Sequence, residues 1–199
     1  MSLTEVLGFV TGAASVWLAA RDNVWNWPIG IANSLFFLFL FFTAGLYANS
    51  GLQIFYIVIG FYGWYAWLRG GEAKTQLDIS RTPRRALPYL VTAGLIGTII
   101  LTSALDRLAG STAPLWDGLT TALSLVAQYM LARKWLENWW VWISADVIYI
   151  VLYANTGLLL TSFLYGIFLM MCVVGYRHWK KTWTATSQSV LEAGPAVGP

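Results

Sequence analysis

The sequence predicts an all-α integral membrane protein that crosses the bilayer seven times. Of its 199 residues, 58% are hydrophobic and 11% are charged, whereas soluble domains contain roughly 45–50% and about 25%. A bilayer core of about 30 Å requires about 20 mostly apolar residues per helix. Seven segments meet this requirement: 3–20, 27–48, 52–68, 87–105, 115–132, 139–154 and 158–176.

The basic residues indicate how these segments are threaded through the membrane. If the charged loop at 69–86 is cytoplasmic, the turns at 21–26 and 133–138 and the C-terminal tail lie on the same side. Eleven of the twelve Lys and Arg residues are then inside and Arg107 alone is outside, as the positive-inside rule describes. We therefore predict a multi-pass protein with its N-terminus outside and its C-terminus inside. The lipid bilayer is an expected partner and nucleic acid is not.

In the first half, the helix at 3–20 is followed by the short turn Arg21-Asp22-Asn23. Pro28 falls in the first turn of the next helix, where proline is tolerated, and a Phe-rich run after it is predicted to face lipid. We expect Asn49-Ser50-Gly51 to form the outer turn. The third helix places a polar and aromatic stripe on one face: Gln53, Tyr56, Gly60, Trp64 and Trp67.

In the second half, the uncharged helix at 87–105 is predicted to be a connector. The fifth helix places Thr121, Ser124 and Gln128 on one face. The tail is rich in Ser, Gly and Pro and is expected to be disordered. The predicted division is a three-helix bundle, a cytoplasmic linker, a connecting helix with an outer loop, a second bundle and a disordered cytoplasmic tail, at 1–68, 69–86, 87–114, 115–181 and 182–199.

The sixth helix carries the strongest candidate site. At about 100° per residue, Trp139, Trp142 and Asp146 fall on one face of it. An ionisable side chain inside a membrane helix is costly and faces a cavity or a partner group. A carboxylate among aromatic rings suits a flat or cationic small molecule. The plainer alternatives are a structural hydrogen bond for Asp146 and interfacial anchoring for the two indoles.

Residues 20–67 and 132–179 match at an offset of 112 to 113, which predicts two three-helix halves. Ala20-Arg21 aligns with Ala132-Arg133 and Trp67 with Trp179. One connecting helix makes the halves parallel, the 3+1+3 arrangement of SWEET-like transporters. The alignment makes Asn33 the counterpart of Asp146. Further candidates for substrate contact, each able instead to bridge helices, are Asn33, Gln53, Tyr165 and Gln128.

Several other classes of protein lack support in the sequence. The sequence has one His, one Cys and, away from the ends of the predicted membrane helices, one acid, Asp146. These supply neither a nucleophile–base pair nor a metal cluster, so no enzyme, cofactor or metal site is expected. No Walker A pattern is present, and an ATP-driven pump would need a partner chain. A channel would need a ring of charge or a filter-like loop, which a multimer could supply.

These residues resemble the PnuC family of vitamin-precursor transporters over about residues 5–181. The resemblance is carried by Trp139-x-x-Trp142-x-x-x-Asp146, the segment 133–138, Leu115-Trp116-Asp117, Gly45-Leu46-Tyr47-Ala48 and Tyr62-Gly63-Trp64-Tyr65-Ala66-Trp67. It implies a 3+1+3 fold in the bacterial inner membrane that carries nicotinamide riboside by facilitated diffusion. Cytosolic phosphorylation then traps the substrate, and homo-oligomerisation is expected.

The sequence departs from the family at Asp146, where the nicotinamide riboside members characteristically have Asn. Relatives of the same fold carry thiamine or riboflavin. An ionised Asp only accepts hydrogen bonds, whereas Asn also donates them. A carboxylate suits a cation, and both nicotinamide riboside and thiamine are cationic. The substitution therefore argues against neutral riboflavin and leaves the other two substrates open.

Overall fold

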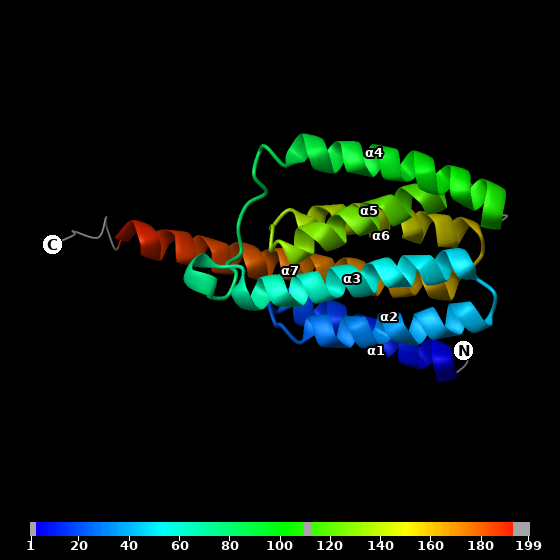
Figure 1. The fold of residues 1–199 in the computed structure, drawn as a ribbon, viewed down its shortest axis with the longest axis horizontal. Helices are drawn as coiled ribbons and strands as arrows, with labels where there is room; N and C mark the ends of the chain where they lie inside the picture. Colours follow the sequence, from blue (N-terminus) through cyan, green and yellow to red (C-terminus); the bar gives the residue numbers. More distant parts are fainter. Residues whose placement is uncertain (1–2, 110–112, 193–199) are drawn as a thin grey trace.

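The computed structural model describes residues 3–109 and 113–192, and this part of the chain is all-helical (Figure 1). A short 3₁₀-helix, η1 (Glu72–Lys74), and a π-helical turn, η2 (Leu105–Ala109), flank the fourth helix. Seven α-helices account for the seven predicted segments: α1 (Leu3–Ala20), α2 (Asn26–Thr43), α3 (Tyr47–Arg69), α4 (Leu87–Ala104), α5 (Pro114–Ala132), α6 (Asn138–Asn155) and α7 (Leu159–Glu192).

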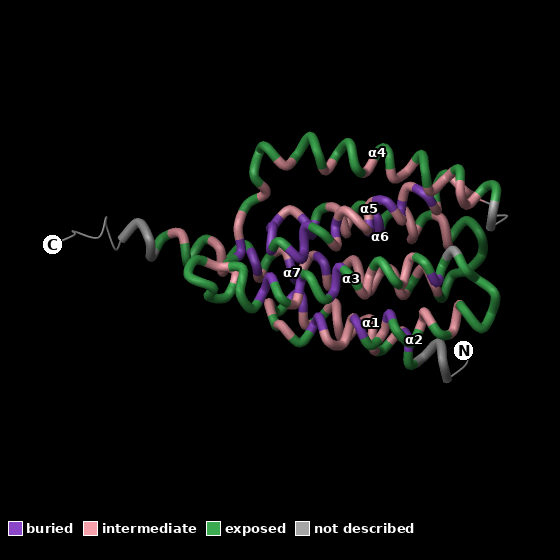
Figure 2. Tube along the Cα trace, in the orientation of Figure 1, coloured by how far each residue is buried: buried purple, intermediate pink, exposed green. Residues whose placement is uncertain are grey.

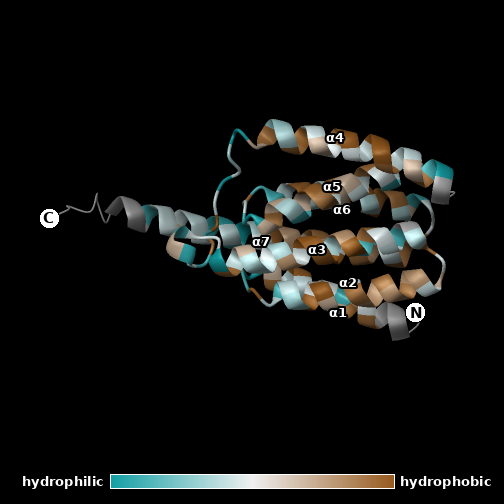
Figure 3. Ribbon diagram, in the orientation of Figure 1, coloured by the Kyte–Doolittle hydropathy of each residue, from teal (hydrophilic) through white to brown (hydrophobic). Residues whose placement is uncertain are grey.

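Four of the described helices, α2, α3, α4 and α7, are long and apolar enough to cross a membrane by length and composition. The helices α5 and α6 are less apolar because they carry Thr, Gln, Asn and Asp side chains that face the interior. Figure 3 shows the hydrophobic residues running along the helices and the hydrophilic ones gathering in the loops at their ends. This distribution is what a multi-pass membrane protein requires.

Six helices form a closed ring in the order α1, α2, α3, α5, α6, α7, each packing against the next and α7 against α1. Helix α4 packs against α5 outside this ring (Figure 1), and none of its residues is buried. A helix that is apolar all round and unburied is suited to face lipid.

The two ends of the bundle differ in charge. The loops 21–25, 70–86 and 133–137 and the C-terminal part of α7 lie at one end, and the start of α1 lies at the other (Figure 1). The first end, called here the basic end, carries eleven of the twelve Lys and Arg residues; Arg107 is at the other. Buried residues also gather toward the basic end (Figure 2).

The outer turn predicted at Asn49-Ser50-Gly51 is wrong, because these residues lie in the first turns of α3. The chain turns instead at Gly45, where φ is +74°. Leu46 N donates to Phe41 O at 2.8 Å and Gly45 N to Phe42 O at 3.1 Å, the paired bonds of a Schellman motif. Glycine has no Cβ and adopts this positive φ without steric strain, so the helix ends there.

The predicted disorder of the tail is wrong up to Glu192, because α7 continues to that residue. The hydroxyl groups of this segment bond back to the helix: Thr182 Oγ1 donates to His178 O and Thr184 Oγ1 to Lys180 O. Residues 182–193 contain neither glycine nor proline, so this part of the sequence has no helix-breaking residue. Residues 193–199 lie outside the described residues.

The linker is docked against the α5–α6 loop. Ser80 N donates to Lys134 O at 3.0 Å, and Leu136 N donates to Ser80 O at 2.8 Å. Thr82 donates to Glu137 Oε2 from both its backbone nitrogen and its hydroxyl, each at 2.7 Å, and Arg81 pairs with the same carboxylate. Partial burial opposes ionisation of Glu137, but the bonds from Thr82 and Arg81 outweigh it and lower the pKa of this carboxyl.

Candidate functional site

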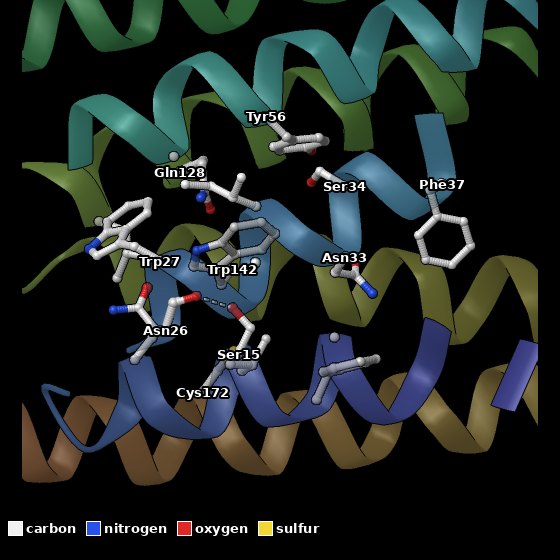
Figure 4. A pocket seen from close by; sticks show the side chains of 18 of the residues that line it. Ser15, Asn26, Trp27, Asn33, Ser34, Phe37, Tyr56, Gln128, Trp142 and Cys172 are labelled. Carbon is white, nitrogen blue, oxygen red and sulfur yellow. Dashed lines mark hydrogen bonds between the residues drawn. The ribbon is translucent and has the colours of Figure 1, made fainter. Parts of the chain in front are cut away.

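A cavity of about 360 Å³ lies inside the ring, and side chains from all six ring helices line it. The volume suits a small organic molecule. The structure brings together in this one lining all seven residues that the sequence singled out: Asn33, Gln53, Gln128, Trp139, Trp142, Asp146 and Tyr165. Figure 4 shows several of these side chains converging from different helices.

Asp146 supplies the only carboxylate among the described residues that line the cavity, and none of them is Lys, Arg or His. It lies on α6 and is 5% exposed. Cys172 on α7 donates its thiol to Asp146 Oδ2 at 3.5 Å. A thiol is a weak donor, so the carboxylate keeps most of its hydrogen-bonding capacity. The cavity is therefore suited to attract a cation.

Trp139 lies where the cavity approaches the basic end. It is 1% exposed, and its ring meets Trp179 edge-on with centroids 5.4 Å apart. A Cβ added to Gly175 would lie 2.6 Å from Trp139 Cζ2, so the glycine makes room for the indole. Trp142 follows three residues later on α6 and is less buried. Trp139 is therefore a residue of the bundle interior and not of its exposed surface.

The polar candidates differ in how far the protein already engages them. The amide nitrogen of Asn33 donates to Gly8 O at 2.9 Å and to Thr11 Oγ1 at 2.6 Å, so Asn33 also ties α2 to α1. Tyr165 stacks on Tyr149 with centroids 4.5 Å apart. Gln128 projects into the cavity near Trp27 and Trp142 (Figure 4). Its amide offers both a donor and an acceptor to a ligand.

Sequence reasoning missed several lining residues, chiefly on α1 and α2. Ser15 Oγ donates to Asn26 O at 2.9 Å, the bond drawn in Figure 4. Other residues missed were Trp27, Ser34, Phe37, Phe168 and Cys172. Tyr56 was placed on the right face of its helix but was not named as a site residue.

A repeat with a uniform offset of 112 would have found part of this set. The ring of Trp27 fills the space beside Gly63 as that of Trp139 does beside Gly175, so these two tryptophans occupy equivalent positions. The earlier alignment, which paired Asn33 with Asp146, is displaced by one residue. At the uniform offset Ser34 is the counterpart of Asp146, and both line the cavity and are buried.

A ring of apolar helices around a cavity lined by aromatic, amide and carboxylate groups is an arrangement suited to a membrane transporter of small molecules. Among the described residues no group of His, Cys, Asp and Glu could hold a metal ion. The family model described as "Nicotinamide mononucleotide transporter" matches residues 2–181. The chain therefore belongs to this family, the PnuC-type transporters.

Individual relatives agree with this assignment. The nicotinamide riboside transporter PnuC of Escherichia coli K12 is 30% identical, in an alignment covering 90% of this chain and 85% of that protein. The riboflavin/roseoflavin transporter RibM of Streptomyces davaonensis is 27% identical, covering 97% and 92%. The crystal structure of the vitamin B3 transporter PnuC superimposes with a TM-score of 0.70 at 26% identity, covering 91% of this chain and 82% of that one.

Proposed function

We propose that this protein takes up nicotinamide riboside across the bacterial cytoplasmic membrane by facilitated diffusion. The observation that carries the proposal is the pairing of one buried carboxylate, Asp146, with tryptophan rings in a cavity whose described lining contains no basic side chain. Nicotinamide riboside is a flat cation with a polar sugar. Its positive ring suits a carboxylate and the faces of indoles. Relatives named as transporters of this compound support the substrate class.

The charge of the lining favours the riboside over its mononucleotide. A phosphate monoester carries a charge of about −1.5 to −2 at neutral pH and is normally bound by Arg, Lys or backbone N–H groups. The described lining supplies Asp146 and no cationic residue. A phosphate in this cavity would stand near a carboxylate without a counter-ion, and like charges at short range repel strongly. Phosphorylation in the cytosol would therefore trap the substrate after entry.

We assign the substrate contacts by chemistry. The nicotinamide ring lies against Trp139 and Trp142 beside Asp146. The ribose hydroxyl groups then bond to the amides and the phenol that line the rest of the cavity: Asn33, Gln53, Gln128 and Tyr165. Amides and phenols both donate and accept hydrogen bonds, as a hydroxyl requires.

The transport mechanism that we propose is rocking of two three-helix halves, α1–α3 and α5–α7, joined by α4. The equivalent Trp–Gly contacts and the closed ring with α4 outside it support a 3+1+3 repeat. The concentration of basic residues at one end supports an orientation with the N-terminus outside and the C-terminus inside. Such halves alternate access around a central site. Homo-oligomerisation would use surfaces outside the ring.

Thiamine is the second candidate, because it is also an aromatic cation and the carboxylate of Asp146 suits it equally. Riboflavin is neutral and gains less from this carboxylate, although a riboflavin transporter is among the relatives. Thermal unfolding of the purified protein with nicotinamide riboside, thiamine, riboflavin or nicotinamide mononucleotide separates these cases, since a ligand of the folded state raises stability in proportion to saturation. We expect the riboside to stabilise most. Stabilisation by the mononucleotide alone would overturn the proposal.

A transport assay completes the test. In proteoliposomes without ATP or an ion gradient, labelled riboside should enter until its internal concentration equals the external one. Accumulation beyond equality would contradict facilitated diffusion. In proteoliposomes that contain a riboside kinase and ATP, the label should continue to accumulate as phosphorylated product.

A further inference from the structure

Four tryptophans, here called the tryptophan layer, belong to one buried cluster: Trp27, Trp67, Trp139 and Trp179. Trp27 and Trp139 line the cavity. Each is at most 2% exposed. The rings meet in a chain, with centroid distances of 5.6 Å for Trp27–Trp67, 5.8 Å for Trp67–Trp179 and 5.4 Å for Trp139–Trp179. The middle contact, Trp67–Trp179, joins α3 of the first half to α7 of the second half.

The layer is held by two hydrogen bonds that cross between the halves in opposite directions. Trp67 Nε1 on α3 donates to Leu131 O on α5 at 3.0 Å, and Trp179 Nε1 on α7 donates to Ala19 O on α1 at 3.0 Å. The two donors, Trp67 and Trp179, are 112 residues apart in the sequence, and so are the two acceptors, Ala19 and Leu131. The two bonds are therefore equivalent. Both join the last turn of one half's first helix to the last helix of the other half.

Beyond the layer, an ion pair joins the same two halves. Lys134 Nζ lies 2.7 Å from Asp22 Oδ1 and 4.4 Å from the centre of the Trp67 ring. Lys134 is buried although it is charged, which is rare unless the charge is paired. Burial raises the pKa of the Asp22 carboxyl, and the nearby Lys134 ammonium opposes that rise.

The turns that present these two residues are strained in the same way. Asp22 has φ +56° and Lys134 has φ +50°, a left-handed conformation that is sterically unfavourable for a residue with a Cβ. Asp22 N donates to Ala19 O and Lys134 N to Leu131 O, so the same two carbonyls also anchor these turns. Such backbone strain persists only where the surrounding structure enforces it, and it is concentrated at ligand-binding sites and conformational switches.

A second pocket, of about 250 Å³, lies against the outer side of these turns. Trp67 and Lys134 contribute to its wall, and the remaining polar lining comes from Arg21, Asp22, Asn23 and Gln76. Trp67 contacts Trp27, which lines the central cavity. The tryptophan layer therefore separates an aromatic cavity from a polar pocket at the basic end.

We propose that the tryptophan layer and the Asp22–Lys134 pair form the inner gate of this transporter, and that substrate leaves through the polar pocket when the halves part at this end. The proposal rests on the rocking mechanism proposed above. Both indole–carbonyl bonds and the ion pair cross between the halves, so parting the halves breaks all three together. The polar pocket then receives a hydrophilic substrate that the closed layer excludes.

Cys172 is a built-in reporter for this gate, because it lines the cavity and is 3% exposed. Its reaction with a membrane-impermeant maleimide is measured from each face of membrane vesicles, and protease cleavage of the linker identifies the basic end. We expect Asp22→Asn and Lys134→Met each to speed labelling from that end by on the order of tenfold, since removing one partner leaves a buried charge unpaired. The swap Asp22→Lys with Lys134→Asp should restore slow labelling.

Arg81→Gln is the matched control, because it removes an ion pair at the same end that does not cross between the halves. Unchanged labelling in both single variants, an equal rise in the control, or no restoration in the swap overturns the proposal. If the charge variants do not fold, Trp179→Phe deletes one indole–carbonyl bond and should also speed labelling. The readout needs no substrate, so a failure of riboside binding leaves the gate testable by itself.

Discussion

Trp139 occupies the space that a side chain at position 175 would need. A Cβ on Gly175 would lie 2.6 Å from Trp139 Cζ2, and the buried ring also packs edge-on against Trp179, one turn further along α7. The close approach of α7 to α6 thus depends on the absence of a side chain at Gly175. The same contact places Trp139 in the cavity wall.

We expect Gly175→Ala to destabilise the protein by about 1–3 kcal/mol, as overpacking of a dense core does. It should also weaken substrate binding, because Trp139 has to move. Gly166→Ala on the same helix is the control, since outside the local helix backbone nothing lies within 4 Å of its added Cβ. The control should be neutral or stabilising by about 0.5–1 kcal/mol. Denaturant titration in detergent micelles measures both, and equal stabilities would contradict the packing argument.

Trp67→Phe and Trp179→Phe should cost similar free energies of unfolding, because their indole bonds have the same length and equivalent acceptors. Each change leaves a buried carbonyl with one bond fewer, a loss of about 1–3 kcal/mol. Trp25→Phe is the control, since Trp25 is 63% exposed. A large difference between the first two variants would show that the bonds are not equivalent in energy.

Asp146→Ala should abolish riboside uptake while the protein still folds and inserts. Asp146→Asn keeps the shape but removes the negative charge, so we expect binding of a cation to weaken at least about tenfold, or about 1.4 kcal/mol. Isothermal titration with the riboside measures the change. Ser144 on the same helix is exposed, so the control variant Ser144→Ala should bind the riboside with normal affinity. Full affinity in Asp146→Asn would exclude the charge as the reason for selectivity.

Docking of the linker should weaken in acid. The pKa of Glu137 is lowered below its ordinary value of 4.5, so its contribution to stability is present above that value and is lost as the pH falls through the folded-state pKa. The melting temperatures of wild type and Glu137→Gln should therefore differ at neutral pH. They should approach each other only as the pH falls below 4.5 toward the lowered pKa of Glu137. Glu72→Gln, an exposed position in the same linker, should follow wild type throughout.

The candidate site was predictable where the signal lay within one helix. Trp139, Trp142 and Asp146 share a face at helical spacing, and the structure places all three in the cavity lining. The α1 and α2 side of the cavity was not predictable in the same way. Trp27 and Ser34 pair with Trp139 and Asp146 only at a uniform offset of 112. A slip of one residue among similar apolar helices changes little in their sequence pattern.

By itself the sequence determined the class of protein, the number of helices and the charged end, because hydropathy, helical periodicity and loop charge are local properties of a chain in a membrane. It also determined the sixth helix as the one with the unusual carboxylate. Only the tertiary structure decided that Lys134 meets Asp22, that Cys172 donates to Asp146, and that two indoles bond to carbonyls of the opposite half. These contacts join residues 26 to 160 positions apart, and only the packing of the helices brings them within hydrogen-bonding distance.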